Sequence, residues 1–223
     1  MSSASSASME IEAPRGAVAP AWHTVVVLLA LVALSLSGAR SGNLPFVRDF
    51  GRAGGYVLVM AFEWAIVAFI WYGVRRRGMR LRDLGIAIGF LVVAQIVLGV
   101  VGYLLKAGAN QAIRNLLPRT PAEIAIFLAL ALTAGFCEEV TFRGYLQRQF
   151  AALTRATAGG ILLQGIAFGA AHGYQGWRLM LVIAVYGCLF GLLARWRRSL
   201  RPGMLAHFLQ DGIGGIALRH LLH

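Results

Sequence analysis

The chain has 223 residues, of which 58% are hydrophobic and only 13% are charged, and its mean hydropathy is +0.69. Soluble domains are about half apolar and about a quarter charged, so this composition excludes an ordinary soluble protein. It also excludes disordered and collagen-like chains, and the two cysteines, Cys137 and Cys188, are too few for a disulfide scaffold. Both cysteines lie in apolar runs, where a buried and unreactive thiol is expected. The sequence therefore predicts an all-α membrane helix bundle.

The formal net charge is +12, from 21 basic and 9 acidic residues. In a soluble protein of this size, such an excess would suggest a nucleic-acid partner. Here the basic residues fall mostly between the apolar runs, as expected of loops and helix ends that face anionic lipid headgroups. We therefore expect contacts with membrane lipid and no nucleic-acid partner.

A Ser- and Ala-rich segment, residues 1–20, is too polar to bury much surface, so a mobile N-terminal tail is expected there. The apolar stretches that follow are long enough to cross a membrane, which takes about 17–25 residues each. They predict a polytopic bundle of about seven transmembrane helices. The predicted spans are residues 21–38, 54–74, 84–105, 121–150, 157–173, 177–195 and 202–219.

The first of these spans has a second interpretation. Its apolar run from Val25 to Leu36 is short and is followed by Ser-Gly-Ala, as in a signal peptide that is cleaved. The tail before it is long and carries a single basic residue, Arg15. This tail favours a span that is not cleaved.

The basic residues also predict an orientation. If the N-terminus is cytoplasmic, the cytoplasmic side receives 12 arginines and the other side 8 basic residues, with Arg143 inside a span. The two dense arginine clusters, at residues 75–82 and 195–201, then lie together on the cytoplasmic side, as the positive-inside rule requires. We expect a cytoplasmic N-terminus. The arginine-rich composition and compact length suggest a bacterial inner (plasma) membrane protein.

Ionisable residues inside the predicted spans are the strongest functional signal. Such groups are costly in a bilayer and usually face the interior of a bundle or a cavity. Six of the seven lie after residue 120, which points to a functional site in the C-terminal part of the chain. The seven are Glu63, Glu138, Glu139, Arg143, His172, His207 and Asp211.

The two adjacent glutamates have different expected roles. On a helix, Glu139 and Arg143 lie four residues apart on one face, with the acid first, so they can neutralise each other. Glu138 is turned about 100° away and has no basic residue three or four positions from it. An unpaired carboxylate in surroundings of low dielectric constant suits general-base catalysis. The alternative is a purely structural charge network of all three residues.

His172 is expected close to Glu138. Counted from a membrane surface near residues 151–156, Glu138 and His172 lie about 13 and about 16 residues deep on antiparallel neighbouring helices. The two side chains are then within one helical turn in height and could share one water molecule. The alternative is an interfacial histidine with a purely structural role.

His207 and Asp211 form a further pair four residues apart. Counted from Arg201, His207 lies only about 9 Å deep, so a tilted helix or a dipping loop must bring it to the other groups. Together these residues fit hydrolysis: Glu138 takes a proton from water, His172 orients that water, and the His207–Asp211 pair stabilises the oxyanion. The sequence contains no serine-nucleophile motif, His-Glu-x-x-His motif, Walker loop or nucleotide fingerprint.

This pattern resembles that of the CPBP intramembrane proteases, a family that includes CAAX prenyl endopeptidases, bacteriocin-processing and self-immunity proteins, and abortive-infection-type bacterial proteins. The resemblance covers about residues 120–215, and the earlier helices match only in being hydrophobic. It divides the chain into the tail (1–20), N-terminal transmembrane helices (21–119) and a catalytic core (120–219). The motifs that carry it, in chain order, are Glu138-Glu139-x-x-x-Arg143 followed by Gly144-Tyr145-Leu146, Phe168-x-x-x-His172 and His207-x-x-x-Asp211.

The resemblance implies an intramembrane endopeptidase of the glutamate type. Glu138 would be its general base, and His172 would help to activate the water. Glu139 and Arg143 would be the supporting pair. His207 and Asp211 would line the oxyanion side.

One position departs from the prenyl-processing members, which typically carry Asn in place of Asp211. An amide can donate a hydrogen bond to an oxyanion, whereas Asp donates only when protonated and can instead accept the N–H of His207. Asp occurs in bacterial members, which favours substrates other than prenylated CAAX proteins. No cofactor is expected. Zinc is the lesser alternative, because carboxylates and imidazoles are suitable ligands for it.

The sequence thus predicts an endopeptidase that cleaves a peptide or protein substrate near the cytoplasmic membrane face. One alternative is a proton-coupled transporter or relay that uses the same buried carboxyl groups. Another is a non-catalytic immunity or partner protein in which the polar cluster only holds helices together.

Overall fold

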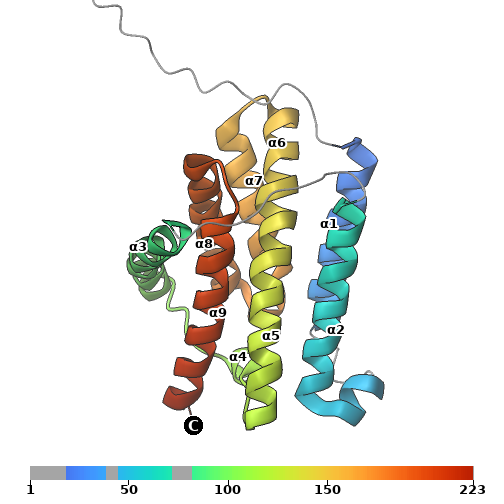
Figure 1. Cartoon of the computed structure of the whole chain (residues 1–223), viewed down its shortest axis with the longest axis vertical. Helices are drawn as coiled ribbons and strands as arrows, with labels where there is room; N and C mark the ends of the chain where they lie inside the picture. The colour runs from blue at the N-terminus through green and yellow to red at the C-terminus, as the bar shows by residue number, and fades with distance from the viewer. Residues whose placement is uncertain (1–18, 39–44, 72–81, 223) are drawn as a thin grey trace, which may run out of the picture.

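The computed structural model describes residues 19–38, 45–71 and 82–222, and this part of the chain is helical with no strand (Figure 1). The prediction of an all-α membrane helix bundle is confirmed. Most of the N-terminal tail and most of the arginine cluster at 75–82 lie outside the described residues. The elements are α1 (Ala21–Gly38), α2 (Pro45–Trp71), α3 (Arg82–Leu104), α4 (Gln111–Leu116), α5 (Pro121–Glu138), η2 (Glu139–Leu146), α6 (Gln147–Thr154), α7 (Thr157–Ala171), η3 (Gly173–Gln175), α8 (Trp177–Arg197) and α9 (Arg201–Leu222).

Each predicted span corresponds to a helical segment, with α5, η2 and α6 joined into one. Within the described residues, four helical segments are long and apolar enough to cross a membrane. Helix α7 differs from its prediction, since it has 15 residues and ends at Ala171. At about 1.5 Å per residue it is about 22 Å long, less than the hydrocarbon core of about 30 Å. The four long segments are Phe50–Phe69, Gly85–Leu104, Pro121–Thr154 and Trp177–Arg197.

Three smaller features were not predicted. Helix α2 begins earlier than expected and is kinked at Gly51, whose φ of 57° favours glycine. The connection between α3 and α5 contains the short helix α4, which begins where the Asn110 side chain accepts a hydrogen bond from the backbone N–H of Ile113. Of the two free thiols, Cys137 is buried as expected, whereas Cys188 is only half-buried.

The longest helical segment carries the two adjacent glutamates at its middle. It begins with a capping box, in which Thr120 and Glu123 satisfy each other's backbone N–H groups. It then passes without a break through the π-helix η2 into α6, and ends where Arg155 takes a φ of 54°. A π-helical turn within an α-helix often marks a functional site. Here it starts at Glu139, directly after Glu138.

Small residues let the helices of the C-terminal part approach closely. A Cβ atom on Gly135 of α5 would lie 2.9 Å from the carbonyl oxygen of Met204 on α9, and one on Gly187 of α8 would lie 2.9 Å from Cα of Gly165 on α7. Contacts this short exclude a side chain at these positions. The backbones of α9 and α5 therefore touch close to the glutamates.

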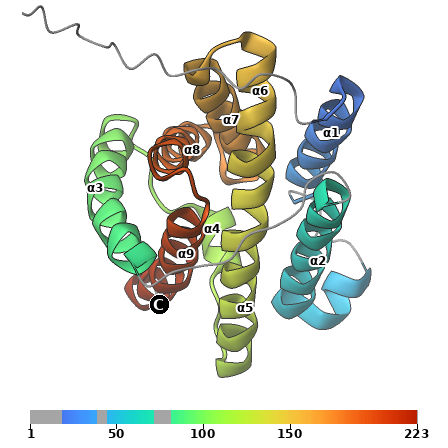
Figure 2. The ribbon, with the colours of Figure 1, turned by 45° about the horizontal axis from the view of Figure 1, so that its top comes forward.

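Helix α1 is attached to the same long segment by polar contacts. The buried Gln149 side chain donates to the carbonyl oxygen of Ala19 at 2.6 Å and accepts from its N–H at 3.3 Å. The Tyr145 hydroxyl lies 2.9 Å from the side chains of both His23 and Thr24. Figure 2 shows α1 and α2 on one side of α5, with α3, α8 and α9 on the other.

Candidate active site

Glu139 and Arg143 form a buried ion pair within the π-helix. Glu139 Oε1 lies 2.8 Å from Arg143 Nη1, and both side chains are completely buried. The guanidinium also lies 4.3 Å from the ring centroid of Phe168 and 4.9 Å from that of Phe190. Ring faces attract a cation, so the arginine is held by aromatic groups as well as by its carboxylate. This pair is surrounded by protein on all sides.

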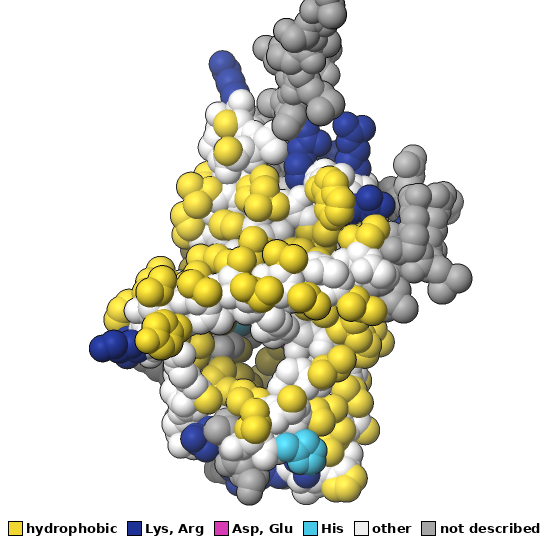
Figure 3. Space-filling model, turned by 90° about the vertical axis from the view of Figure 1, so that its left-hand side faces the viewer, with side chains coloured by type: hydrophobic (Ala, Val, Ile, Leu, Met, Phe, Trp, Pro, Cys, Tyr) yellow, Lys and Arg dark blue, Asp and Glu magenta, His cyan; other side chains and the backbone are white. Residues whose placement is uncertain are grey.

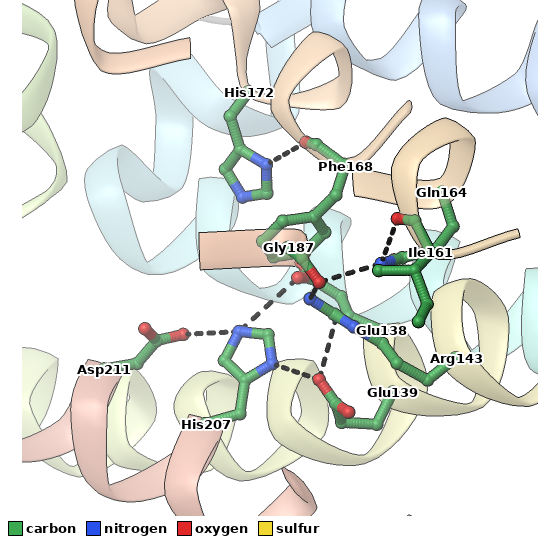
Figure 4. A network of polar contacts seen from close by, with 10 residues as sticks. All are labelled: Glu138, Glu139, Arg143, Ile161, Gln164, Phe168, His172, Gly187, His207 and Asp211. Carbon is green, nitrogen blue, oxygen red and sulfur yellow. Dashed lines mark hydrogen bonds and ion pairs between the residues drawn. The ribbon is translucent and has the colours of Figure 1, made fainter. Parts of the chain in front are cut away.

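His207 connects this ion pair to the other carboxyl groups (Figure 4). Its Nδ1 lies 3.2 Å from Glu139 Oε1, and because a carboxylate only accepts hydrogen bonds, Nδ1 carries a proton there. Its Nε2 lies 3.5 Å from Glu138 Oε2 and 3.6 Å from Asp211 Oδ2. The Asp211 distance is that of an ion pair rather than a hydrogen bond. The imidazole is thus fixed mainly by Glu139, and its other nitrogen faces Glu138 and Asp211.

The depth of His207 has a clear structural cause. The turn between α8 and α9 lies beside Gly144, since a Cβ atom there would be 3.1 Å from Leu200 Cδ1. This position is ten residues before the long helical segment ends at Thr154. Counting depth from Arg201 therefore places His207 too near the surface, because the turn dips into the bundle. A Cβ on Gly203 would lie 2.6 Å from Glu139 Oε2, so α9 also has no room for a side chain beside this carboxylate.

His172 faces this group from the end of the short helix α7. Its Nδ1 lies 2.8 Å from the carbonyl oxygen of Phe168, to which it must donate, so in a neutral ring Nε2 is left as an acceptor. The next aromatic residue, Tyr174, lies with its ring 6.1 Å from the imidazole. Burial raises the pKa of Tyr174 to about 12, so its hydroxyl stays protonated at neutral pH.

A single cavity of about 1330 Å³ connects these side chains; Glu138, His172, His207 and Asp211 all line it. The Glu138 side chain is 17% exposed and that of Asp211 39%, whereas that of Glu139 is 0%. The cavity therefore exposes Glu138 to water and to a substrate, and excludes its neighbour. In space-filling view a hollow lies beneath α3, rimmed mainly by hydrophobic side chains (Figure 3).

The lining of the cavity continues from Glu138 toward Arg52, Gln111 and Leu221. These residues lie near the N-terminal end of α2, on α4 and at the C-terminal end of α9. We call this end of the bundle the α4 end. It is the end away from Arg155 and from the turn between α8 and α9.

The donor set for zinc is not arranged as a metal site. Within the described residues, no group of three or more His, Cys, Asp or Glu side chains is placed to hold a metal ion. Nδ1 of each histidine is engaged, by the Phe168 carbonyl in His172 and by Glu139 in His207. Nε2 of each ring is therefore left for contacts within the site.

Two contributions to the site were not assigned from the sequence. Glu63 of α2 lines the same cavity and is 7% exposed, although its position in the sequence gave only an isolated acid in a span. Phe190 of α8 lies against both Arg143 and the His207 ring, at 4.9 and 5.4 Å. A Phe within an apolar span carries no signal that would separate it from ordinary packing.

Comparison with known proteins agrees with the geometry. Residues 120–213 match the family model described as type II CAAX prenyl endopeptidase Rce1-like. No curated protein and no solved structure matches the chain. The matched residues contain Glu138, His172 and His207 together with Asp211, and the family indicates a membrane protease, a hydrolase. The resemblance to the CPBP/CAAX protease family is confirmed over residues 120–213.

Proposed function

We propose that the protein is an intramembrane endopeptidase of the glutamate type, with Glu138 as its general base. The observation that carries this proposal is the contrast between the two adjacent glutamates. Glu138 lines the cavity with His172 and His207, whereas Glu139 is completely buried and paired with Arg143. A carboxylate that faces a cavity and has no guanidinium partner is suited to take a proton.

The proposed reaction begins with a water molecule between Glu138 and His172. Glu138 accepts one proton from it, while Nε2 of His172 accepts a hydrogen bond from its other proton and orients it. The water oxygen attacks the carbonyl carbon of the scissile peptide. The resulting oxyanion is stabilised by the Nε2–H of His207 in its doubly protonated form, held in place by Glu139 through Nδ1. Glu138 then passes its proton to the leaving nitrogen, and the products are a carboxyl group and an amine.

Asp211 lies on the oxyanion side of this arrangement. At 3.6 Å from Nε2 of His207, it balances the charge of the imidazolium without competing for its hydrogen bond. Substrates would be peptides or proteins at the membrane. No cofactor is required, and zinc is the lesser alternative.

The test compares membranes from cells that express the wild type or Glu138→Gln at equal levels, by mass spectrometry of new N- and C-termini. Loss of a general base typically slows a reaction about 10²–10⁴-fold, so fragments formed with the wild type should be absent with Glu138→Gln. His172→Ala should behave in the same way. Glu123→Gln is the matched control, because it makes the same chemical change at the far end of α5, where Gln also suits a capping box. Proteolysis retained by a well-folded Glu138→Gln protein would rule out the proposal.

The side of the membrane from which a substrate reaches Glu138 bears on two predictions from the sequence. These are the cytoplasmic N-terminus and cleavage near the cytoplasmic face. The cavity lining reaches the α4 end, and α1 begins at the opposite end, where Ala19 contacts Gln149. We propose that the substrate reaches Glu138 through the α4 end. If the N-terminus is cytoplasmic, the α4 end lies on the opposite side of the membrane, and the substrate enters from there. If the substrate instead enters from the cytoplasm, the N-terminus must lie outside, so the two predictions cannot both hold. The placement in a bacterial inner membrane is part of the same proposal.

The second candidate is a proton-coupled transporter or relay. It is favoured by the series of titratable groups along the cavity, from Glu63 through Glu138 and His207 to Asp211. Purified protein in liposomes with a pH gradient distinguishes the two, because a relay moves protons or solute without cutting a peptide. A non-catalytic immunity or partner protein would keep its cellular function in Glu138→Gln.

A further inference from the structure

A second carboxyl group lies against the proposed base and comes from outside the matched region. Glu63 of α2 is 7% exposed, and its carboxyl group is within hydrogen-bonding reach of that of Glu138. Both groups line the same cavity. The buried Oε2 atoms of Glu63 and of Glu138 both lack a hydrogen-bond partner among the described residues. The N-terminal helices therefore supply a polar group to a site that otherwise belongs to residues 120–213.

Two carboxyl groups can form a hydrogen bond only if one of them carries a proton, because two carboxylates have no donor and repel each other. Besides Glu63 and Glu138, the titratable groups that line the cavity are Arg52, Tyr56, Cys137, His172, Tyr174, Tyr186, His207 and Asp211, and His207 also contacts Glu139, the partner of Arg143.

Glu63 is the member of the pair that is better suited to hold the proton. Glu138 already has the Nε2 atom of His207 at 3.5 Å, so a proton on that nitrogen points toward its carboxyl group. Glu63 is more deeply buried, and burial favours the neutral acid. A neutral Glu63 can donate a hydrogen bond to Glu138 and so restrict the orientation of its carboxylate.

We propose that Glu63 is a positioning residue, whose protonated carboxyl group donates a hydrogen bond to Glu138 and holds it in place to take a proton from water. The proposal rests on the proposed function for its role in the reaction. Glu63 keeps its proton through the cycle, so the atoms transferred remain those described for Glu138.

The first test does not depend on activity. Infrared difference spectroscopy of the full-length protein in liposomes, at neutral pH, measures the C=O stretch of protonated carboxylic acids. We expect such a band in the wild type, its loss in Glu63→Gln, and its shift in Glu138→Gln, because the proton is shared by this pair. Glu123→Gln, at the surface end of α5, should leave the band unchanged. A wild type without the band, or a band that persists in Glu63→Gln, overturns the proposal.

The second test uses the fragments that the wild type forms in isolated membranes, with their rate measured from pH 5 to 10 (about the range in which these groups titrate). Glu63→Gln keeps a hydrogen-bond donor and cannot ionise, so it should cleave at neutral pH and retain activity further into the alkaline range. Glu63→Met fills the same space without a donor. It should slow cleavage about 10- to 100-fold and move the acidic limb of the profile to higher pH. A Glu63→Met protein with the rate and the pH profile of the wild type overturns the proposal.

The two proposals can fail separately. If Glu138→Gln abolishes cleavage while both Glu63 variants match the wild type, only the role of Glu63 is wrong. If the wild type forms no fragments, the proposed function is wrong, and the infrared band alone decides whether Glu63 and Glu138 share a proton. Melting temperatures in detergent identify a variant that has failed to fold, and Glu63→Gln, the closest substitution in shape, keeps the test decisive.

Discussion

The candidate active site has two halves that differ in their contact with the cavity. The buried half consists of Glu139 and Arg143, whose side chains are 0% exposed. The cavity half consists of Glu138, with 17% of its side chain exposed, and of His172, His207 and Asp211, which line the same cavity. The buried half is held by short contacts and fixes geometry, whereas the cavity half has acceptors left over for water and substrate. The two halves should therefore respond differently to mutation: the first in stability and the second in rate.

The largest effect on stability should come from Arg143→Met. This change leaves the carboxylate of Glu139 buried without its cation, which typically costs about 3–5 kcal/mol. Thermal unfolding in detergent should show a markedly lower melting temperature and a lower expression level. Adding Glu139→Gln to this variant removes the unpaired charge and should recover much of the stability. If Arg143→Met alone is as stable as Arg143→Met combined with Glu139→Gln, the buried half is not held by this ion pair.

A smaller loss of stability should follow Gly203→Ala. The new Cβ would lie 2.6 Å from Oε2 of Glu139, so either the carboxylate or α9 must shift. Overpacking of this kind typically costs about 1–3 kcal/mol. Gly214→Ala on the same helix is the control, because the atom nearest to its Cβ would be Nε2 of Gln210 at 3.7 Å. Melting temperatures should separate the two variants, and equal values would contradict the close approach of α9 to the buried half.

Asp211→Asn, in the cavity half, should leave the melting temperature unchanged and alter the cleavage rate by less than about tenfold. Asp211 lies 3.6 Å from Nε2 of His207, so it adds charge but little hydrogen bonding to the imidazole. The rate of fragment formation in membranes provides the measurement. A loss as large as that of Glu138→Gln would assign Asp211 a direct part in proton transfer.

The side from which the cavity half is reached can be tested without changing activity. Two cysteine variants place a thiol at either end of the bundle. Asn115→Cys changes a residue of α4, and Ser199→Cys changes a residue of the turn between α8 and α9. A membrane-impermeant thiol reagent should label the two positions from opposite sides, with Ser199→Cys labelled from the cytoplasm if the arginine count is correct. The parent chain, with Cys137 buried and Cys188 half-buried, measures the background. Labelling of Ser199→Cys from outside would instead place the α4 end in the cytoplasm.

The spans could be predicted because each is an unbroken apolar run, and the fold class followed from them. The end of α7 was predicted two residues late, at 173, because the His172-Gly173 sequence after the apolar run does not by itself show where the helix stops. The depth of His207 was wrong when counted from Arg201, because a charged residue does not mark the membrane surface when its turn dips into the bundle. The contrast between Glu138 and Glu139 was visible in helical spacing alone. Their partner Glu63 was not, because its contact joins residues 75 positions apart.

The early end of α7 also bears on how water reaches the site. The chain leaves α7 at His172, passes through the short turn of η3 and begins α8 at Trp177, all after a helix of only about 22 Å. Backbone that is not α-helical is tolerated at membrane depth only where it is buried in protein or lines a space filled with water. Since His172 and Gln175 both line the cavity, we expect this space to hold water within the bilayer. The proposed hydrolase needs water as its second substrate, and the early end of one helix would supply it locally.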